Sequence, residues 1–445
     1  MYQGGEKKGL NIFLFHVYFV TLQQNSLQIM KIKHLEIENF RAIEHLDLNC
    51  SNGTNVFIGD NGAGKSTVLD AIAILFSWLN ARFSSPKGRG RNIRKEDIRN
   101  GSDYCFLSIE TEHLGMNIRW SLFKGITPHT HTDRYTDLSS LDSFVSYFRK
   151  SHEDERYLFT IYGVNRNIPT ITLNKRVYGS KEGKRDAVRS TFSSTSWKQF
   201  FNWYYERENE ENRMKARFNA QYHDESLDAI RDCLAEVFPD YRNLRIEDRP
   251  TRFVIEKGDQ EVNFERLSDG EKCYITLVLD IARRLSLQND GMKPILDGQL
   301  LILIDEVDLH LHPSWQLCVV SNLQRKFPNC QFFVTSHSSL VLSSLDENSQ
   351  LVVLRDGNRV ELSDIPYGDN GDYILKRFFG LESVRNPMVQ AEIDSIAAEL
   401  GKEHPDINNV EYRLNALSDK GVQFEESVKM RLQLAQKKKE AHEKD

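Results

Sequence analysis

The sequence contains few cysteines, and none of them lie close together. Six occur among 445 residues, and no two form the C-x-x-C pair that is typical of zinc ribbons and redox motifs. They are Cys50, Cys105, Cys233, Cys273, Cys318 and Cys330. This spacing excludes a disulfide-rich scaffold and is typical of proteins in reducing compartments. We therefore expect a cytoplasmic protein.

Long apolar runs are also missing. Residues 10–22 are mostly apolar but are interrupted by Asn11 and His16, and the run is shorter than the ~20 residues that a membrane-spanning helix requires. We therefore expect no membrane partner. The net charge of -6 argues against a uniformly basic nucleic-acid coat, although it leaves a local basic face open.

One glycine-rich motif stands out. Residues 58–67 read Ile-Gly-Asp-Asn-Gly-Ala-Gly-Lys-Ser-Thr and fit G-x-x-x-x-G-K-[ST], the phosphate-binding loop. A short apolar run precedes the motif and a helical pattern follows it, so the loop is predicted to end at a helix N-terminus that attracts phosphate. We expect Lys65 to reach the β- and γ-phosphates of ATP, and the Ser66 hydroxyl to bind magnesium (Mg²⁺). The predicted nucleotide-binding residues of the loop are Gly59, Asp60, Asn61, Gly62, Ala63, Gly64, Lys65, Ser66 and Thr67.

An apolar strand ending in two acids completes a predicted hydrolytic site. Residues 301–304 are Leu-Ile-Leu-Ile, followed by Asp305 and Glu306. Asp305 at the tip of the strand is a candidate Mg²⁺ ligand, and Glu306 is a candidate general base for the attacking water. Alone, such a run also fits a plain strand and turn. Together with the phosphate loop it predicts ATP hydrolysis.

A third motif precedes a predicted helix over residues 273–287, whose pattern is amphipathic. Ser268 and Glu271 fit S-x-x-E, a helix-capping box. The same geometry points main-chain amides outward, so this helix start is also a candidate anion site. Both interpretations can hold at once.

Residues 267–272, Leu-Ser-Asp-Gly-Glu-Lys, resemble the signature motif of ABC-type ATPases. In that superfamily two heads enclose two ATP molecules, and the resemblance implies that Ser268 and Gly270 contact the γ-phosphate bound by the opposite subunit. It also implies that Asp308 lies in the D-loop at the dimer seam and that His337 senses the γ-phosphate. We assign His310 and His312 to packing and turn formation. The catalytic residues implied are Lys65, Ser268, Glu306 and His337.

The branch of the superfamily is indicated by other segments. Residues 35–41 resemble the opening of RecF, SMC and OLD-like proteins, which differs from that of transporter subunits. Residues 162–166, 366–370 and 378–380 resemble the PtuA-type ATPases of Septu and retron-linked anti-phage systems. Roughly two hundred residues, many strand-like, separate Lys65 from Ser268, which leaves no room for the long coiled-coil arm of SMC proteins. A fused TOPRIM nuclease is not indicated, and no glutamine-loop residue can be assigned.

The fold class expected is α/β: an ABC-type P-loop ATPase head with a mixed sheet, an inserted helical lobe and a C-terminal helical tail. We interpret residues 1–29 as an upstream extension or a short docking segment. The predicted divisions are an N-terminal lobe with the P-loop (30–165), an inserted, largely helical lobe (166–260), a C-terminal lobe with the other motifs (261–385) and a partner-docking tail (386–445).

The leading functional hypothesis is an ATPase that forms a homodimer or higher homo-oligomer around ATP and regulates an HNH-type nuclease partner in anti-phage defence. The alternative is a RecF-like, ATP-dependent clamp that holds DNA for repair. Basic stretches at residues 82–99 and 175–189 motivate this alternative.

Overall fold

The computed structural model describes residues 30–126, 134–151, 159–164, 196–248, 251–289, 293–362, 366–402, 405–422 and 430–436. Residues 1–29 and the basic stretch at 175–189 lie outside this set. The chain divides into two compact units, Met1–Gly371 and Asp372–Asp445. Among the described residues no helix is both long and apolar enough to span a membrane.

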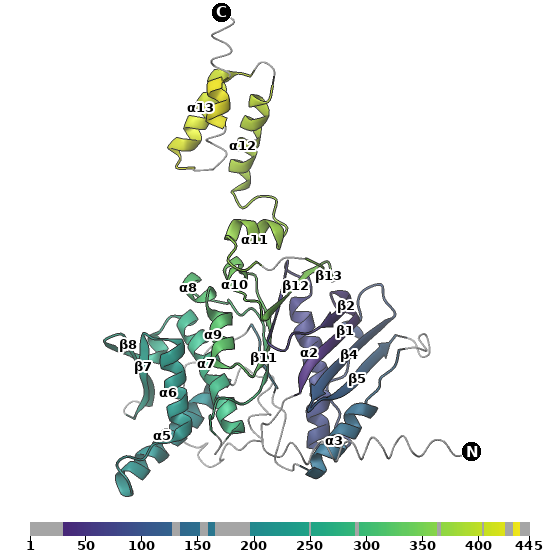
Figure 1. Cartoon of the computed structure of the whole chain (residues 1–445), viewed down its shortest axis with the longest axis vertical. Helices are drawn as coiled ribbons and strands as arrows, with labels where there is room; N and C mark the ends of the chain where they lie inside the picture. The colour runs from purple at the N-terminus through teal and green to yellow at the C-terminus, as the bar shows by residue number, and fades with distance from the viewer. Residues whose placement is uncertain are drawn as a thin grey trace, which may run out of the picture. The chain divides into compact units, whose positions relative to one another are not determined.

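A mixed sheet of ten strands organises the described part of the first unit (Figure 1). Its order is β5-β4-β1-β2-β13-β12-β3-β11-β10-β6. The bounds are β1 Lys31–Phe40, β2 Ile43–Asn49, β3 Thr54–Gly59, β4 Tyr104–His113, β5 Met116–Gly125, β6 Phe159–Tyr162, β10 Leu301–Ile304, β11 Gln331–Thr335, β12 Ser349–Arg355 and β13 Asn358–Val360. Strands β12, β3, β11, β10 and β6 are parallel neighbours, whereas β5, β4, β1 and β2 pair antiparallel. This mixed α/β sheet confirms the expected fold class.

The parallel strands explain why distant motifs meet. Strands β10 and β11 are buried at every position, as expected for strands covered on both faces. Because the carboxyl ends of parallel strands lie at one edge of a sheet, the segments after β3, β10 and β11 come together there. Those segments are the phosphate-binding loop, the Asp305–Glu306 pair and the His337 turn.

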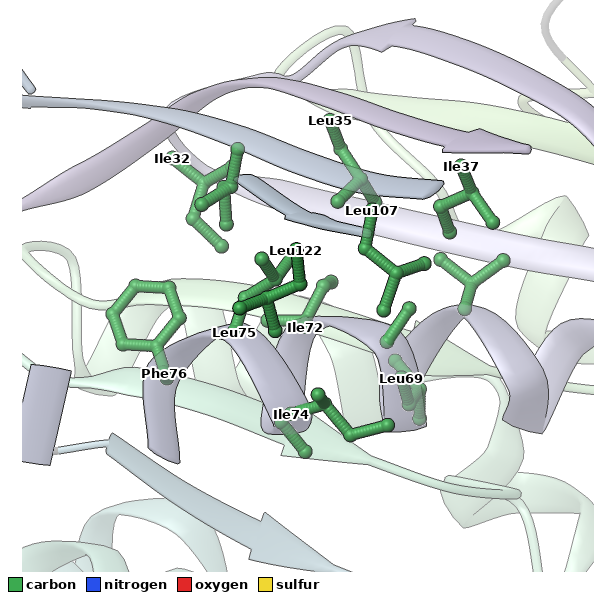
Figure 2. Packing of buried hydrophobic residues seen from close by; sticks show 14 of the residues in the cluster. Ile32, Leu35, Ile37, Leu69, Ile72, Ile74, Leu75, Phe76, Leu107 and Leu122 are labelled. Atoms are coloured by element: carbon green, nitrogen blue, oxygen red, sulfur yellow. The ribbon is translucent and has the colours of Figure 1, made fainter. Parts of the chain in front are cut away.

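Helix α2 (Lys65–Ser84) forms the centre of the main apolar core. The ring of Phe76 lies 5.8 Å from Trp120 of β5 and 5.3 Å from Phe159 of β6, the two edge strands of the sheet. The sheet therefore curls around the helix and brings its edges to one side chain. Figure 2 shows part of this packing, with helix residues Leu69, Ile72 and Leu75 beneath sheet residues Ile32, Leu35, Leu107 and Leu122. Helix α3 (Ser139–Ser151) adds Phe144 and Phe148 to the same core.

The segment between β6 and the signature motif contains helices and a small sheet. Helices α5 (Ser196–Arg217) and α6 (Glu225–Val237) precede three antiparallel strands, β7 (Tyr241–Asp248), β8 (Thr251–Lys257) and β9 (Gln260–Asn263). Rings from α5 pack on Phe253 of β8, which in turn contacts Phe264 just before the signature motif. The small sheet is therefore anchored both to α5 and to the start of the next helix.

Helix α7 (Asp269–Gln288) differs from the amphipathic helix predicted. It is buried on nearly all sides from Cys273 onward, including Asp280, Arg283 and Arg284. Asp280 accepts hydrogen bonds from both arginines and from the Tyr162 hydroxyl of β6 (2.8 Å). The polar positions of the pattern therefore meet one another and a tyrosine of the main sheet rather than solvent.

Three short helices complete the described part of the head: α8 (Pro313–Gln316), α9 (Val319–Lys326) and α10 (Ser339–Ser343). Helix α11 (Gly371–Arg377) lies at the border of the two units. The second unit contains α12 (Pro387–Leu400) and α13 (Ile407–Asp419). A small apolar core holds it together, made by Ile393, Ile396, Leu400, Val410, Leu414, Leu417, Met430 and Leu434.

Candidate functional site

The phosphate-binding loop joins β3 to α2, and its neighbours fix its shape. Gly64 is the N-cap of α2 with φ of 105°, and a Cβ there would lie 2.4 Å from Cδ1 of Ile43 in β2. A Cβ on Gly59, whose φ is 147°, would lie 2.1 Å from the carbonyl oxygen of Leu354 in β12. Only glycine permits these contacts. The loop is thus packed against β2 at Gly64 and against β12 at Gly59.

The N-terminus of α2 is suited to an anion. Among the described residues no side chain caps it, and its first turn contains no acidic residue, so its main-chain donors remain for a ligand. Asp60, Asn61 and Gly62 form the exposed outer part of the loop, whereas Ala63 is buried. Thr67 follows within the helix. The structure thus brings the predicted loop residues together at one helix start.

Lys65 is folded back over the loop. Its Nζ donates hydrogen bonds of 2.9 Å to the carbonyl oxygens of Gly59 and Asp60, and the residue is only 6% exposed. Burial lowers the pKa of Lys65 below its ordinary value, while the carboxylates of Asp305 and Asp60 act in the opposite direction. The ammonium group is therefore held within the phosphate-binding loop by two main-chain carbonyl oxygens.

Asp305 is the point where α2 and two strands converge. Its Oδ1 accepts hydrogen bonds from the Ser66 hydroxyl (2.9 Å) and from the Thr335 hydroxyl of β11 (2.7 Å). Its main-chain N–H donates to the carbonyl oxygen of Tyr162 at the end of β6 (2.8 Å). Hydroxyl and carboxylate oxygens that converge in this way suit a hard divalent cation such as Mg²⁺, so Ser66 and Asp305 could hold one.

Glu306 has an unusual backbone conformation. Its φ is 50°, a left-handed value that non-glycine residues rarely adopt and that is found preferentially at functional sites. The conformation is fixed because the N–H of Glu306 donates to the Thr335 hydroxyl (2.7 Å) and the N–H of Val307 donates to the Thr335 carbonyl (2.9 Å). The expected base is therefore held at the strand end by one threonine.

Thr335 contacts two candidate site residues, and the sequence motifs did not assign it a role. Its side chain contacts both Asp305 and the main chain of Glu306, so it sets the relation between the candidate metal ligand and the candidate base. In the sequence, Thr335 is marked only by its place at the end of an apolar run, two residues before His337. Its contact with the acidic pair depends on the pairing of β10 with β11, which the sequence does not show.

The predicted switch histidine lies at the same edge. The N–H of Ser336 donates to the carbonyl oxygen of Phe57 in β3 (3.1 Å), which places the half-buried His337 beside the strand that leads into the phosphate loop. The following residue, Ser338, donates to Oε1 of Gln316 in α8 (2.6 Å), and Nε2 of Gln316 donates to the carbonyl of Leu311 (2.8 Å). The switch turn and the D-loop segment are thus joined by one glutamine.

The signature residues form a capping box, as predicted. Ser268 is the N-cap of α7; its N–H donates to Oε2 of Glu271 (2.7 Å), and its Oγ accepts from the Glu271 N–H (3.4 Å). Gly270 packs tightly against the D-loop of the same chain, because a Cβ there would lie 2.1 Å from the carbonyl oxygen of His310. Sequence reasoning missed this intrachain contact.

The two histidines of the D-loop segment are both exposed, and they lie at turns of the backbone. His310 has a left-handed φ of 62°, and the ring of His312 accepts from the Ser314 N–H as the N-cap of α8. Asp308, the predicted seam residue, is half-buried. Its Oδ1 is shielded from solvent and has no hydrogen-bond partner within the described part of the chain.

The chain resembles several known proteins. The family described as "AAA domain, putative AbiEii toxin, Type IV TA system" matches residues 54–343. The chain is 26% identical over 431 residues to the "Retron Ec83 probable ATPase" of Escherichia coli, covering 81% of this chain and 79% of that protein. It is 25% identical over 413 residues to the "Septu protein PtuA" of Bacillus thuringiensis, covering 87% and 94%. Among solved structures, the SMC head domain from Thermotoga maritima matches with 15% identity and a TM-score of 0.43, covering 75% of this chain and 100% of that one.

Proposed function

We propose a function that starts from the family of this chain. The chain belongs to the family described as "AAA domain, putative AbiEii toxin, Type IV TA system". It is a P-loop ATPase of the ABC-like class, related to the retron and Septu ATPases. In our proposal, two or more copies assemble around ATP and Mg²⁺, and the nucleotide state of this assembly regulates a partner nuclease of HNH type in anti-phage defence.

The observation that carries the proposal is the convergence at Asp305. Ser66, Thr335 and the main chain of Glu306 are tied to one another around this carboxylate, directly beside the phosphate-binding loop. Bound Mg²⁺ would neutralise charge on the phosphates. Lys65 would bind the β- and γ-phosphates, Glu306 would accept a proton from the attacking water, and His337 would contact the γ-phosphate.

The signature residues support a second copy. Ser268 is bonded within its own helix start, and Gly270 is packed on His310. The phosphate-loop side chains bond instead to the loop itself and to the strand ends. We infer that a second copy supplies the γ-phosphate that Ser268 would contact, as the resemblance to the signature motif implies. The buried Oδ1 of Asp308 is an acceptor that such a copy could satisfy.

The nuclease partner is inferred from the relatives and from the second unit. Retron and Septu ATPases are among the most similar proteins. In the second unit Met388 and Tyr412 are 82% and 75% exposed, over a core of only a few side chains. Contiguous exposed apolar surface indicates a docking site, and we propose that Met388 and Tyr412 contribute to such a surface. We assign residues 386–445 this role.

The test is the mass of the complex. The chain is co-expressed with the protein of its neighbouring open reading frame, and the mass of the purified complex is measured by native mass spectrometry with and without ATP. We expect a homo-oligomer that carries an HNH-containing protein, and we expect Met388→Asp with Tyr412→Asp to release that protein. Phe218→Asp, at a residue 77% exposed in the first unit, is the matched control and should retain it. A lone chain that ignores ATP would refute the proposal.

One observation favours a direct DNA clamp as a second candidate. The loop after α2 presents Lys87, Arg89, Arg94 and Lys95 as exposed side chains. The loop is held on α2, because the Trp78 Nε1 donates to the Arg91 carbonyl (3.0 Å) and the Arg91 N–H donates to the Ser77 hydroxyl (2.7 Å). A fixed group of exposed cations is suited to a phosphate backbone.

Salt-dependent duplex binding tests this candidate. Charge reversal of Arg89, Arg91 and Arg94 should weaken binding and flatten its dependence on salt by about one unit of slope per lost phosphate contact. Lys376→Glu, at an exposed cation of α11, serves as the control. Binding that is absent, or equal in all variants, would remove the candidate.

A further inference from the structure

The carboxylate of Glu271 does more than close the capping box. While Oε2 accepts the main-chain N–H of Ser268, Oε1 accepts hydrogen bonds from the Tyr241 hydroxyl and from the Lys257 ammonium. Tyr241 belongs to β7 and Lys257 to β8, so both donors come from one hairpin of the segment inserted before the signature motif. The N-cap of α7 is therefore connected to this hairpin through one side chain.

The hydrogen bonds at this contact favour the ionised form of the Glu271 carboxylate. Burial acts to raise the pKa of Glu271, but hydrogen bonds from Lys257, Tyr241 and Ser268 outweigh it and lower the pKa to about 2. Burial and the neighbouring carboxylate raise the pKa of Tyr241, so its hydroxyl keeps its proton and donates. Lys257 also lies over the Tyr241 ring, 5.7 Å from its centroid. Charge-assisted hydrogen bonds of this type are the stronger ones in proteins.

The hairpin packs through Tyr241 against aromatic side chains of the neighbouring helices. The Tyr241 ring lies 6.1 Å from Phe238 and 6.4 Å from Trp315 of α8, and Trp315 lies 5.5 Å from Tyr274 of α7. Tyr241 thus joins an aromatic cluster shared by α6, α7 and α8. A displacement of the hairpin would therefore move the Glu271 carboxylate, and with it the main chain of Ser268.

We propose that Glu271 is a positioning residue for Ser268, and that the β7–β8 hairpin, acting through Tyr241 and Lys257, sets the competence of the signature serine for ATP held by the opposite subunit. The inference rests on the proposed function, because only a composite site gives Ser268 a phosphate to contact. It identifies the inserted segment as a place where a bound partner can control hydrolysis without touching nucleotide.

Glu271→Gln is the decisive variant. An amide has one acceptor oxygen, so it can satisfy the Ser268 N–H or the hairpin donors but not both. We expect kcat to fall by about tenfold to a hundredfold, since small misplacements of a positioned group have effects of this size. The KM for ATP should change little, because the phosphate loop is untouched. Tyr241→Phe and Lys257→Met each remove one donor and should give intermediate rates.

Glu256→Gln is the matched control within the same hairpin. Glu256 precedes Lys257 in β8 and binds Arg242 and Asn243 rather than the signature motif. Its replacement removes the same charge and should leave kcat at the parent value. If Glu256→Gln and Glu271→Gln lowered the rate equally, or if Glu271→Gln weakened ATP binding to the same degree as kcat, a general structural role would replace the proposal.

Mixing experiments separate this inference from the proposed function. Lys65→Ala protein is mixed with Glu271→Gln protein, so that mixed dimers contain one site with an intact lysine and an intact signature. We expect the mixture to hydrolyse ATP faster than the sum of its parts, as should a mixture with Ser268→Arg. Recovery with Ser268→Arg but not with Glu271→Gln would overturn the inference alone. Recovery with neither would overturn the composite site and the inference together.

Discussion

Gly270→Ala tests the close contact between the signature helix and the D-loop. A Cβ at this position would lie 2.1 Å from the carbonyl oxygen of His310 and 3.1 Å from its carbonyl carbon. Both partners are main chain, so neither can turn aside as a side chain would. His310 already has a left-handed φ of 62°, which leaves little freedom for the D-loop to retreat.

The expected cost follows from this geometry. Adding a methyl group to a filled site costs about 1–3 kcal/mol, and the smaller unfolded-state entropy of alanine returns about 0.4–1 kcal/mol. We expect a net loss of about 1–2 kcal/mol in the free energy of unfolding. Because Gly270 lies in the larger unit, Met1–Gly371, this lowers Tm by less than the ~2–4 °C per kcal/mol found for domains of about 150–250 residues.

The functional effect should exceed the loss of stability. ATP binding should stay within about twofold, because the phosphate loop makes no use of Gly270, whereas kcat should fall about tenfold or more as Ser268 and Asp308 move apart. The assays are calorimetric ATP binding, phosphate release and thermal unfolding. Gly401→Ala is the control, since a Cβ there meets carbonyl oxygens only at 3.6 Å. Parent kcat and Tm in Gly270→Ala would refute the reasoning.

Four further outcomes follow from the site. Lys65→Ala should weaken ATP binding about tenfold to a hundredfold in calorimetry, as the loss of one charge-assisted contact of ~1.5–3 kcal/mol implies; unchanged binding would contradict its phosphate role. Glu306→Gln should bind ATP normally, hydrolyse it about 10²–10⁴-fold more slowly and accumulate as an ATP-bound dimer in native mass measurements; turnover at the parent rate would require another base. Thr335→Val should cost about 1–3 kcal/mol of stability, because it leaves the Glu306 N–H without its acceptor, and should lower kcat, whereas a neutral result would show that Thr335 does not fix the pair. The pKa of Glu271 is lowered from 4.5 to about 2, so its contribution to stability is present above pH 4.5 and is lost as the pH falls from 4.5 to about 2. Over this pH range the urea midpoint should fall less steeply with pH for Glu271→Gln than for the parent. Equal slopes for the two proteins would contradict the assignment.

Motifs contiguous in the chain were predictable from the sequence. The phosphate loop, the acidic strand end and the capping box depend on local geometry, namely a tight turn, a strand tip and a helix start, so neighbouring residues suffice to specify them. Parallel pairing of the apolar runs then places these motifs at one sheet edge. Residues 273–287 form the predicted helix, but its polar positions are buried, because a helical pattern shows which positions are polar but not whether another element covers them. The role of Thr335 could not be predicted, since it depends on the registration of β10 against β11.

The sequence by itself determined that this chain binds and hydrolyses a nucleoside triphosphate, because phosphate recognition needs only a short run of glycines, a lysine and a helix N-terminus. The tertiary structure alone decided which distant groups meet. It set Thr335 between Asp305 and Glu306, pressed Gly270 onto the carbonyl of His310, and joined Glu271 to Tyr241 and Lys257. The physical reason is range: hydrogen bonds and steric contacts act over a few ångströms, so residues far apart in sequence interact only once the whole sheet and its covering helices have formed.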